Sequence, residues 1–327
     1  MLTACADSQQ NDAKEYAQRV ANVLDIDLSG AIEPVLTFPS SSELTISPAQ
    51  HKLSIREFMS MRQCKLHTIV ASKNSQMGRL APASQVLFSD LQVLRYGPEC
   101  VAQLRGDDQL ELADKLERYL SSKETLIEEI MWQAILGSSE NAKFWSRSKR
   151  IDNYPDELSV DPLQSIESLQ RLIEDVQDNH YSVSPQRELE IEDSLRNLSY
   201  ADGGLLLQRL ARVNAGLGMA DELIQQALLR PLCFDAKPNQ KSNFLKNVVL
   251  KFFIGQVQPR LVKLLQRYQQ LMPHYLQLEN LLSDSAPPAY QQWQKQRQNV
   301  FEQAHNSAKR HVANLQQIFT QCGIQLN

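Results

Sequence analysis

The last forty residues of this chain limit its fold more than any other part of the sequence. Between Pro288 and Cys322 apolar side chains recur mainly three and four positions apart, namely at Tyr290, Trp293, Val300, Ala304, Ala308, Leu315 and Ile318. This spacing places them on one face of a single helix of more than thirty residues, with Gly323 as its expected stop. Such a helix buries its apolar face against other long helices, which predicts a bundle.

Composition favours helices along the whole chain. Only 11 of the 327 residues are glycine, and leucine and glutamine recur throughout, which is typical of helices rather than of strands joined by tight turns. We therefore predict an all-α, multi-helix bundle with long C-terminal helices. The net charge of -4 argues against a nucleic-acid partner, which would require a basic surplus. No stretch has the roughly 18 uninterrupted apolar residues that a membrane-spanning helix needs.

The amino terminus, MLTACADSQQ, contains a tetrapeptide with the form of a bacterial lipobox. Leu2 is a branched apolar residue, two small residues follow it, and Cys5 closes the pattern. The cysteine sulfur of a lipobox carries diacylglycerol, so we interpret Cys5 as a lipidation site. A lipoprotein signal also needs a basic segment and about 7 to 15 apolar residues upstream. Because only Met1 precedes the box, we expect that the natural chain starts before Met1.

Four cysteines remain once Cys5 is set aside, namely Cys64, Cys100, Cys233 and Cys322. None belongs to a CxxC pair or lies near a histidine at zinc-ligand spacing, so no metal site is predicted. An even number of cysteines in an oxidising compartment predicts two disulfides. Three connectivities are possible, and proximity in the sequence favours Cys64–Cys100 with Cys233–Cys322. The alternative interpretation is five reduced thiols in a cytosolic protein.

Helical patterns and their interruptions divide the chain into three predicted parts. Residues 1–50 form a lipid-anchor region with a short helix followed by a tether rich in proline and serine. Residues 51–150 form an N-terminal helical part that contains the Cys64–Cys100 hairpin. Residues 151–327 form the C-terminal helical bundle.

Within these parts, glycine, proline and capping residues predict where helices begin and end. The Gly-Pro pair at 97–98 is expected to end a helix. The pattern over residues 108–136 predicts two helices, the second with a capping box that starts at Ser121. Helices are expected to begin at Pro162 and Pro185, since a capping residue precedes each proline.

Residues 74–82, NSQMGRLAP, are predicted to form a turn beside the Cys64–Cys100 bond. Asn74, Ser75 and Arg79 place polar groups on this turn, so they are our candidate binding loop. Turn formation alone also explains these residue types.

Two patterns that resemble functional motifs have a structural interpretation that we favour. Glu302 and His305 have the spacing of ligands in ferritin-like di-iron bundles, but no second histidine has a glutamate three positions before it. Gly216 and Gly218 resemble part of a nucleotide-binding loop, but they lie within a helical pattern, which predicts a close helix contact or a local bend. No catalytic residue and no cofactor is predicted.

Several stretches together resemble a known family. They are LTAC at the start, the segment from QCKLHTIVASKNSQMGRLAP to RYGPEC, RPLC at residues 230–233, VQP at residues 257–259 and the closing QCG. In these stretches the chain is similar to uncharacterised Gram-negative bacterial lipoproteins that are catalogued as domain of unknown function 3080. The resemblance implies an envelope lipoprotein with no assigned activity and with no catalytic residues to carry over.

These features lead to one expected function and two alternatives. We expect a periplasmic lipoprotein anchored to the outer membrane through acylated Cys5, because Ala6 follows the cysteine where aspartate would favour the inner membrane. Its expected role is binding or scaffolding, with an envelope protein or peptidoglycan as the partner. One alternative is an enzyme that acts on envelope glycans or lipids through carboxylates in an interhelical cleft. The other, if the lipobox is a coincidence, is a cytosolic helical regulator.

Overall fold

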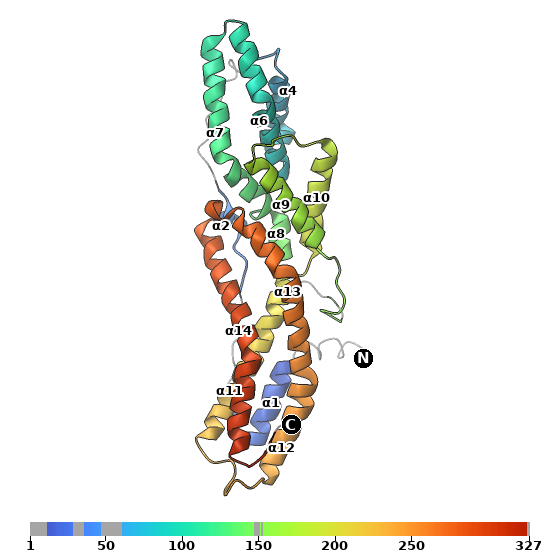
Figure 1. Cartoon of the computed structure of the whole chain (residues 1–327), viewed down its shortest axis with the longest axis vertical. Coiled ribbons are helices and arrows are strands. Elements are labelled where there is room, and N and C mark those ends of the chain that lie inside the picture. The colour runs from blue at the N-terminus through green and yellow to red at the C-terminus, as the bar shows by residue number, and fades with distance from the viewer. Residues whose placement is uncertain (1–11, 29–35, 47–60, 147–150, 152, 326–327) are drawn as a thin grey trace.

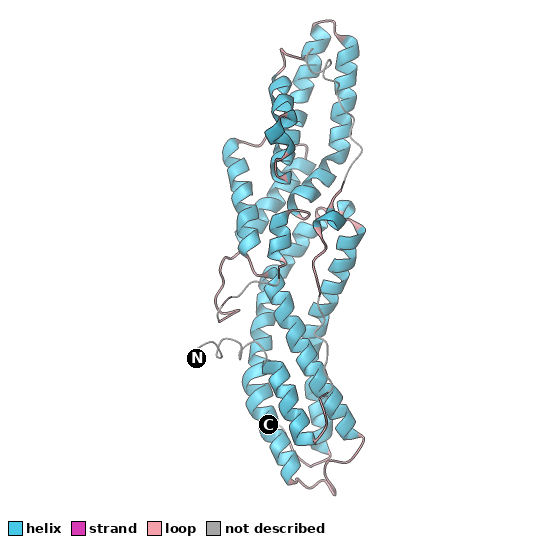
Figure 2. Cartoon of the chain, turned by 180° about the vertical axis from the view of Figure 1, so that it is seen from behind, coloured by secondary structure: helices cyan, strands magenta, loops and turns pink. Residues whose placement is uncertain are grey.

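The structure is a computed structural model that describes residues 12–28, 36–46, 61–146, 151 and 153–325. Within these ranges every regular element is a helix, and no residue forms a strand (Figure 2). The helices pack side by side and end to end into a long, narrow molecule (Figure 1). The predicted all-α, multi-helix architecture is therefore confirmed.

One end of the molecule is a bundle around the first helix. The helices α1 (Asp12–Leu24) and α14 (Pro288–Thr320) both pack against α11 (Gly203–Leu228). Three consecutive helical segments complete this bundle as one continuous helix. They are α12 (Gln240–Val248), the π-helix η2 (Val249–Val257) and α13 (Gln258–Asn280). The long terminal helix that the sequence predicts is thus present and lies within a bundle.

The other end is a helical hairpin with one further helix beside it. In this hairpin α6 (Ala83–Gly106) packs along α7 (Leu110–Ile135), and α4 (Lys65–Asn74) packs against α6. The middle of the molecule holds α8 (Ser139–Phe144), α9 (Leu163–Gln177) and α10 (Pro185–Tyr200). Because α9 contacts α13, it connects the middle of the molecule to the bundle. Three short elements complete the described chain, namely α2 (Ser41–Leu44), α5 (Gln76–Arg79) and η3 (Ser283–Ser285).

Two groups of buried apolar side chains hold these helices together. The larger group runs through the bundle and the middle of the molecule, and it includes Tyr16, Leu217 and Phe319. The smaller group joins α4, α6 and α7 around residues such as Leu66 and Leu116. The helices α6 and α7 contribute to both groups. The predicted division of the chain into three parts is not tested by this packing and stays a prediction.

Helix starts follow the local sequence closely. The backbone N–H of Arg187 donates to the Ser184 hydroxyl, which caps α10, and Pro185 is the first residue of that helix. The helix α9 begins directly after Pro162, and α14 begins at Pro288. The helix starts predicted at these prolines are confirmed to within one residue.

Two predicted helix breaks are wrong. The helix α6 continues through Gly97 and Pro98, because α7 packs directly on its backbone at this point. A Cβ atom on Gly97 would lie 2.3 Å from a methyl carbon of Leu120, so glycine permits this contact. The packing outweighs the backbone hydrogen bond that Pro98 cannot donate. The helix α7 likewise passes through Ser121 without a break, since Leu120 and Ile127 continue its buried face.

Both disulfides favoured by sequence proximity are present. Cys64, the residue before α4, is bonded to Cys100 of α6, and the bond closes a separation of 36 residues. Cys233, in the loop after α11, is bonded to Cys322, which lies just beyond α14, across 89 residues. All four sulfur atoms belong to buried residues. The first bond therefore fixes the start of α4 to α6, and the second fixes the end of α14 to the loop after α11.

The close helix contact predicted at Gly216 occurs between α11 and α1. A Cβ atom on Gly216 would lie 2.6 Å from the carbonyl carbon of Ala13, whereas one on Gly218 would meet nothing within 4 Å. We expect Gly216→Ala to displace α1 and to lower the free energy of unfolding by about 1–3 kcal/mol. Gly218→Ala should raise it by about 0.5–1 kcal/mol, because alanine is a better helix former. Chemical denaturation measures both effects, and equal effects at the two glycines would contradict this contact.

Candidate functional site

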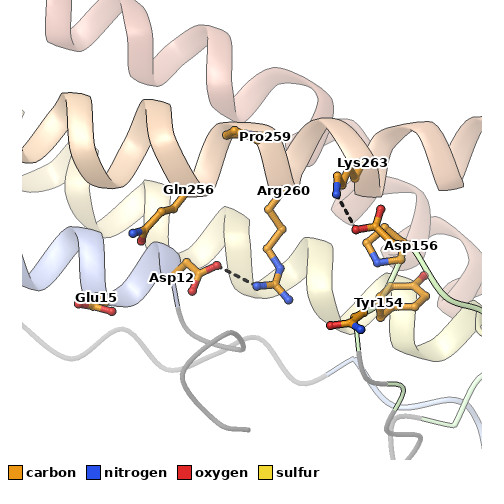
Figure 3. A pocket seen from close by; sticks show the side chains of 10 residues that line it. Asp12, Glu15, Tyr154, Asp156, Gln256, Pro259, Arg260 and Lys263 are labelled. Carbon is orange, nitrogen blue, oxygen red and sulfur yellow. Dashed lines mark hydrogen bonds and ion pairs between the residues drawn. The ribbon is translucent and has the colours of Figure 1, made fainter. Parts of the chain in front are cut away.

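An open polar pocket lies where three distant segments of the chain meet. Its volume is about 540 Å³, and Figure 3 shows its lining side chains. They come from the start of α1, from the segment at 153–156, and from the end of η2 together with the first turns of α13, which continues it. The lining includes Asp12, Glu15, Tyr154, Asp156, Gln256, Arg260 and Lys263. The pocket therefore depends on the tertiary fold and not on a local motif.

Two ion pairs join the segments across the pocket. Arg260 donates from Nη1 to Asp12 Oδ2 at 2.8 Å and thereby holds the start of α1 against α13. Lys263 lies 2.5 Å from Asp156 and holds the 153–156 segment against the same helix. Both members of the second pair are about half exposed, so that pair contributes little to stability. These contacts shape the rim of the pocket (Figure 3).

Behind this rim, a buried network fixes Tyr154. The Tyr154 hydroxyl donates to Asp202 Oδ2 at 2.8 Å, and Arg267 donates to both oxygens of the same carboxylate at 3.0 and 2.8 Å. Burial and the charge of Asp202 raise the pKa of Tyr154 well above its ordinary value. Tyr154 is therefore a neutral hydrogen-bond donor at physiological pH, and its side chain is a rigid part of the wall.

A second arginine near the pocket lacks the partners that its neighbours have. Arg209 of α11 is 7% exposed, and its Nε and Nη1 atoms have no hydrogen-bond partner in the part of the chain that the structure describes. Burial, and then the nearby charges of Arg260 and Arg212, lower the pKa of Arg209. A buried guanidinium without partners is unfavourable. Arg209 is not among the described residues that line the pocket, but it is close enough to Arg260, Tyr154 and Asp12 to interact with them electrostatically.

The π-helix η2 forms one edge of the pocket through Gln256. A π-helix is wider than an α-helix, because its backbone hydrogen bonds join residues five positions apart. Such segments are frequent at functional sites. Phe252 and Phe253 of η2 are buried against the bundle, whereas Gln256 is exposed. Pro259 lies two residues beyond the end of η2 and cannot donate a backbone hydrogen bond to the preceding turn. The stretch VQP at 257–259 is therefore the point where the wide helix returns to α-helical geometry.

A buried series of hydrogen-bonded side chains, from a tyrosine through a histidine to an aspartate, lies in the same bundle. Tyr16 Oη lies 2.8 Å from His311 Nε2, and His311 Nδ1 lies 2.7 Å from Asp221 Oδ1. This order of groups resembles a catalytic relay, but Tyr16 and His311 are fully buried. This series joins α1, α14 and α11, so its evident role is to hold three helices in register.

Asp221 gives the stability of the fold a measurable pH dependence. Burial opposes ionisation, but hydrogen bonds from His311 and Asn314 outweigh it and hold the pKa of Asp221 below its ordinary value. A lowered pKa stabilises the fold above about pH 4, and this stabilisation is lost as the pH falls through the folded-state value. We expect Asp221→Asn to lower the free energy of unfolding by about 1–3 kcal/mol at neutral pH. The difference from the parent should shrink below about pH 4. Urea denaturation across pH tests this, and a constant difference would contradict it.

The described residues that line this pocket include none of the residues predicted from the sequence as sites. Cys5 lies outside the described residues. Asn74 is the last residue of α4, and Ser75 caps the short helix α5, which ends at Arg79. The Ser75 hydroxyl accepts from the backbone N–H of Gly78, so the predicted turn contains a helical turn. Whether these residues bind anything is not tested by the structure and stays a prediction.

Metal-ligating and carboxylate side chains are spread over the described residues. Within them, no group of three or more metal-ligating side chains comes together. Glu302 and His305 both point to solvent as exposed residues of α14. The buried carboxylates each have a cationic partner, namely Asp90 with Lys123, Asp202 with Arg267, Asp221 with Arg310 and Glu279 with Arg297. Across the described helices, none has the length and hydropathy that crossing a bilayer requires.

Sequence reasoning missed the residues that build the pocket. Asp12, Arg260 and Lys263 are ordinary polar residues of helical patterns, and no motif marks them. The nearest signals were Pro155 and Pro259, which mark irregular backbone on two sides of the pocket. Only the packing of α1 onto α11 and onto η2, which continues into α13, brings these groups together.

Comparison with known proteins gives a family and no activity. Residues 13–326 match the family described as Protein of unknown function (DUF3080). The match covers nearly the whole chain, including both disulfides and every described residue that lines the pocket except Asp12. No curated protein and no solved structure matches the sequence.

Proposed function

The chain belongs to this DUF3080 family, and from that premise we propose that it is a lipoprotein of the Gram-negative cell envelope with a binding role. In this proposal Cys5 is acylated and holds the protein at the periplasmic face of the outer membrane. The polar pocket at the start of α1 receives an acidic group of an envelope partner, either peptidoglycan or a protein.

The cysteines support an oxidising compartment. Four of the five cysteines form two disulfides, and such bonds persist in the periplasm and are rare in the cytosol. Cys5 is the cysteine left over, and it is preceded by the small residues that a lipobox requires. Two or more acyl chains on one cysteine would give stable anchoring.

The observation that carries the proposal is the position of the pocket relative to Cys5. The helix α1 starts at Asp12, which lines the pocket, and Asp12 follows Cys5 by seven residues. A fully extended chain of this length spans at most about 25 Å. An anchor on Cys5 would therefore keep the pocket within that distance of the bilayer surface. A binding site near a membrane anchor suits the capture of an envelope component.

The chemistry of the pocket favours a carboxylate or a similar acidic group. Arg260 and Lys263 bring two cations to the pocket, and Arg209, which is buried near Arg260, adds a guanidinium whose Nε and Nη1 atoms lack protein partners among the described residues. Arginine forms paired hydrogen bonds with carboxylates, which occur in peptidoglycan peptides and in acidic side chains of proteins. Because the buried carboxylates of the described chain are already paired with cations, the pocket is better suited to binding than to acid–base catalysis.

Two experiments in the native organism test this proposal. Cells are grown with an alkyne-labelled fatty acid, and the label should attach to the parent protein and not to a Cys5→Ala variant. Separately, a photo-crosslinking amino acid at Gln256, in the pocket, should capture an envelope component, whereas the same group at exposed Gln303 of α14 should not. Absence of the label from the parent would contradict the anchor. Equal capture at both positions would contradict the pocket.

A further inference from the structure

The end of the bundle opposite the hairpin carries large apolar side chains in solvent. Leu229 is 83% exposed, Phe234 is 77% exposed and Phe244 is 52% exposed. They lie at the end of α11, in the loop to α12 and in the first turns of α12, which come together at one extremity of the molecule (Figure 1). We call these three residues the apolar tip. Single exposed apolar residues are common, but a group at one extremity marks an interaction surface.

The loop that carries the apolar tip is fixed to the bundle. The Cys233–Cys322 bond ties it to the end of α14, one residue before Phe234. Gly323 adopts a φ of +63°, and a Cβ atom there would lie 2.5 Å from the carbonyl oxygen of Ala236, so only glycine fits this close contact. Asn239 donates from Nδ2 to the carbonyl oxygen of Leu232 at 2.7 Å. The disulfide, the close contact at Gly323 and this hydrogen bond fix the loop in place, and Phe234 remains exposed on it.

The segment that carries the apolar tip is rich in basic residues. Residues 229–246 contain Arg230, Lys237, Lys241 and Lys246 but a single acidic residue, Asp235, although the whole chain has a net charge of -4. Lys241 pairs with Asp25 at 2.8 Å and donates to the carbonyl oxygen of Leu24. Arg230 and Lys237 are exposed, and neither has an ion-pair partner in the described part of the chain. Large apolar side chains among free basic ones are typical of surfaces that bind anionic bilayers.

The length of α1 places this surface at the level that an anchor on Cys5 can reach. The contact between Lys241 and Leu24 brings the end of α1 to the start of α12. The 13 residues of α1 span about 20 Å from the pocket to this point. The seven-residue separation of Cys5 from Asp12 spans at most about 25 Å. This separation is therefore long enough for an anchor on Cys5 and the apolar tip to meet the same bilayer.

We propose that the apolar tip inserts into the headgroup region of an anionic bilayer, with Arg230 and Lys237 contacting the lipid headgroups. The bundle then stands on the membrane with α1 directed toward it, and the polar pocket faces the periplasm above the surface. This inference goes beyond the proposed function, because the contact does not require acylation of Cys5.

Vesicle binding of the full chain tests the inference without the anchor. The Cys5→Ser chain, with both disulfides formed, is floated with vesicles of phosphatidylcholine alone or mixed with phosphatidylglycerol. We expect binding to the mixed vesicles only. Phe234→Ser/Phe244→Ser should weaken it by at least about tenfold, and Arg230→Gln/Lys237→Gln should weaken it by about fivefold per charge. Met77→Ser/Leu80→Ser is the matched control, because Met77 is 84% exposed and Leu80 is 86% exposed elsewhere on the molecule.

Three results would overturn the inference. The first is a parent chain that does not bind anionic vesicles, and the second is equal weakening by the tip variant and the Met77/Leu80 control. The third is a parent that sediments as a dimer and becomes a monomer on Phe234→Ser/Phe244→Ser, since the apolar tip would then be an interface between two copies. Since all substituted side chains are exposed, circular dichroism should show unchanged helicity and an unchanged melting temperature in each variant.

Discussion

Replacing Cys233 and Cys322 together by serine is expected to lower the free energy of unfolding by about 4 kcal/mol. The bond closes a separation of 89 residues, and in the chain-entropy account a longer closed loop restricts the unfolded state more strongly. It also fixes the end of α14 to the loop after α11. Chemical denaturation of the oxidised parent and of the double variant measures the difference.

The other cysteines provide the comparison for this result. Cys64→Ser/Cys100→Ser should lower the free energy of unfolding slightly less, because that bond closes a separation of only 36 residues. Its loss should act mainly on the smaller buried group formed by α4, α6 and α7. Cys5→Ser is the control for loss of a sulfur that takes part in neither bond. If all three variants were as stable as the parent, the bonds would not contribute to the fold as described.

Removal of Arg297 is the second large effect that we expect. Arg297 of α14 donates to both oxygens of Glu279 on α13, at 2.9 and 2.6 Å, and both residues are at most 3% exposed. The guanidinium lies 4.8 Å from the ring centre of Trp145 and 4.7 Å from that of Trp293. Tyr290 donates a further hydrogen bond to Glu279. Arg297→Met leaves Glu279 as an unpaired buried charge and should lower the free energy of unfolding by about 3–5 kcal/mol.

A double substitution separates the effect of the Arg297–Glu279 ion pair from that of the aromatic side chains around Arg297. Arg297→Met/Glu279→Leu removes both charges, so it should restore part of the stability that Arg297→Met loses. Lys295→Met, an exposed position of the same helix, should change stability by less than about 0.5 kcal/mol. Urea denaturation of the four proteins completes the comparison. A double variant less stable than Arg297→Met would show that Arg297 acts through its aromatic neighbours and not through Glu279.

Local sequence rules predicted most of the helices. The Ser-Pro pair at 184–185 and the apolar pattern after Pro288 both reflect interactions within a few residues. The cysteines were predictable for another reason. With four candidates there are few pairings, and proximity in the sequence selected the one that the structure contains.

The failed predictions arose where tertiary packing outweighs local preference. Pro98 weakens α6, but α7 packs so closely at Gly97 that the helix continues. The pocket and the buried ion pairs were beyond sequence reasoning, because their partners lie far apart in the chain. Arg267 and Asp202 are 65 residues apart, and Arg260 and Asp12 are 248 apart. No periodic pattern encodes such a pairing.

The most direct test of the central claim, an acylated and disulfide-bonded envelope protein, is its intact mass after purification from native cells. The protein is alkylated without reductant before the measurement. The account predicts a chain that starts at Cys5, carries the mass of a lipid modification and has no alkylated cysteine. A chain that retains Met1, carries no lipid and has five alkylated cysteines would contradict it.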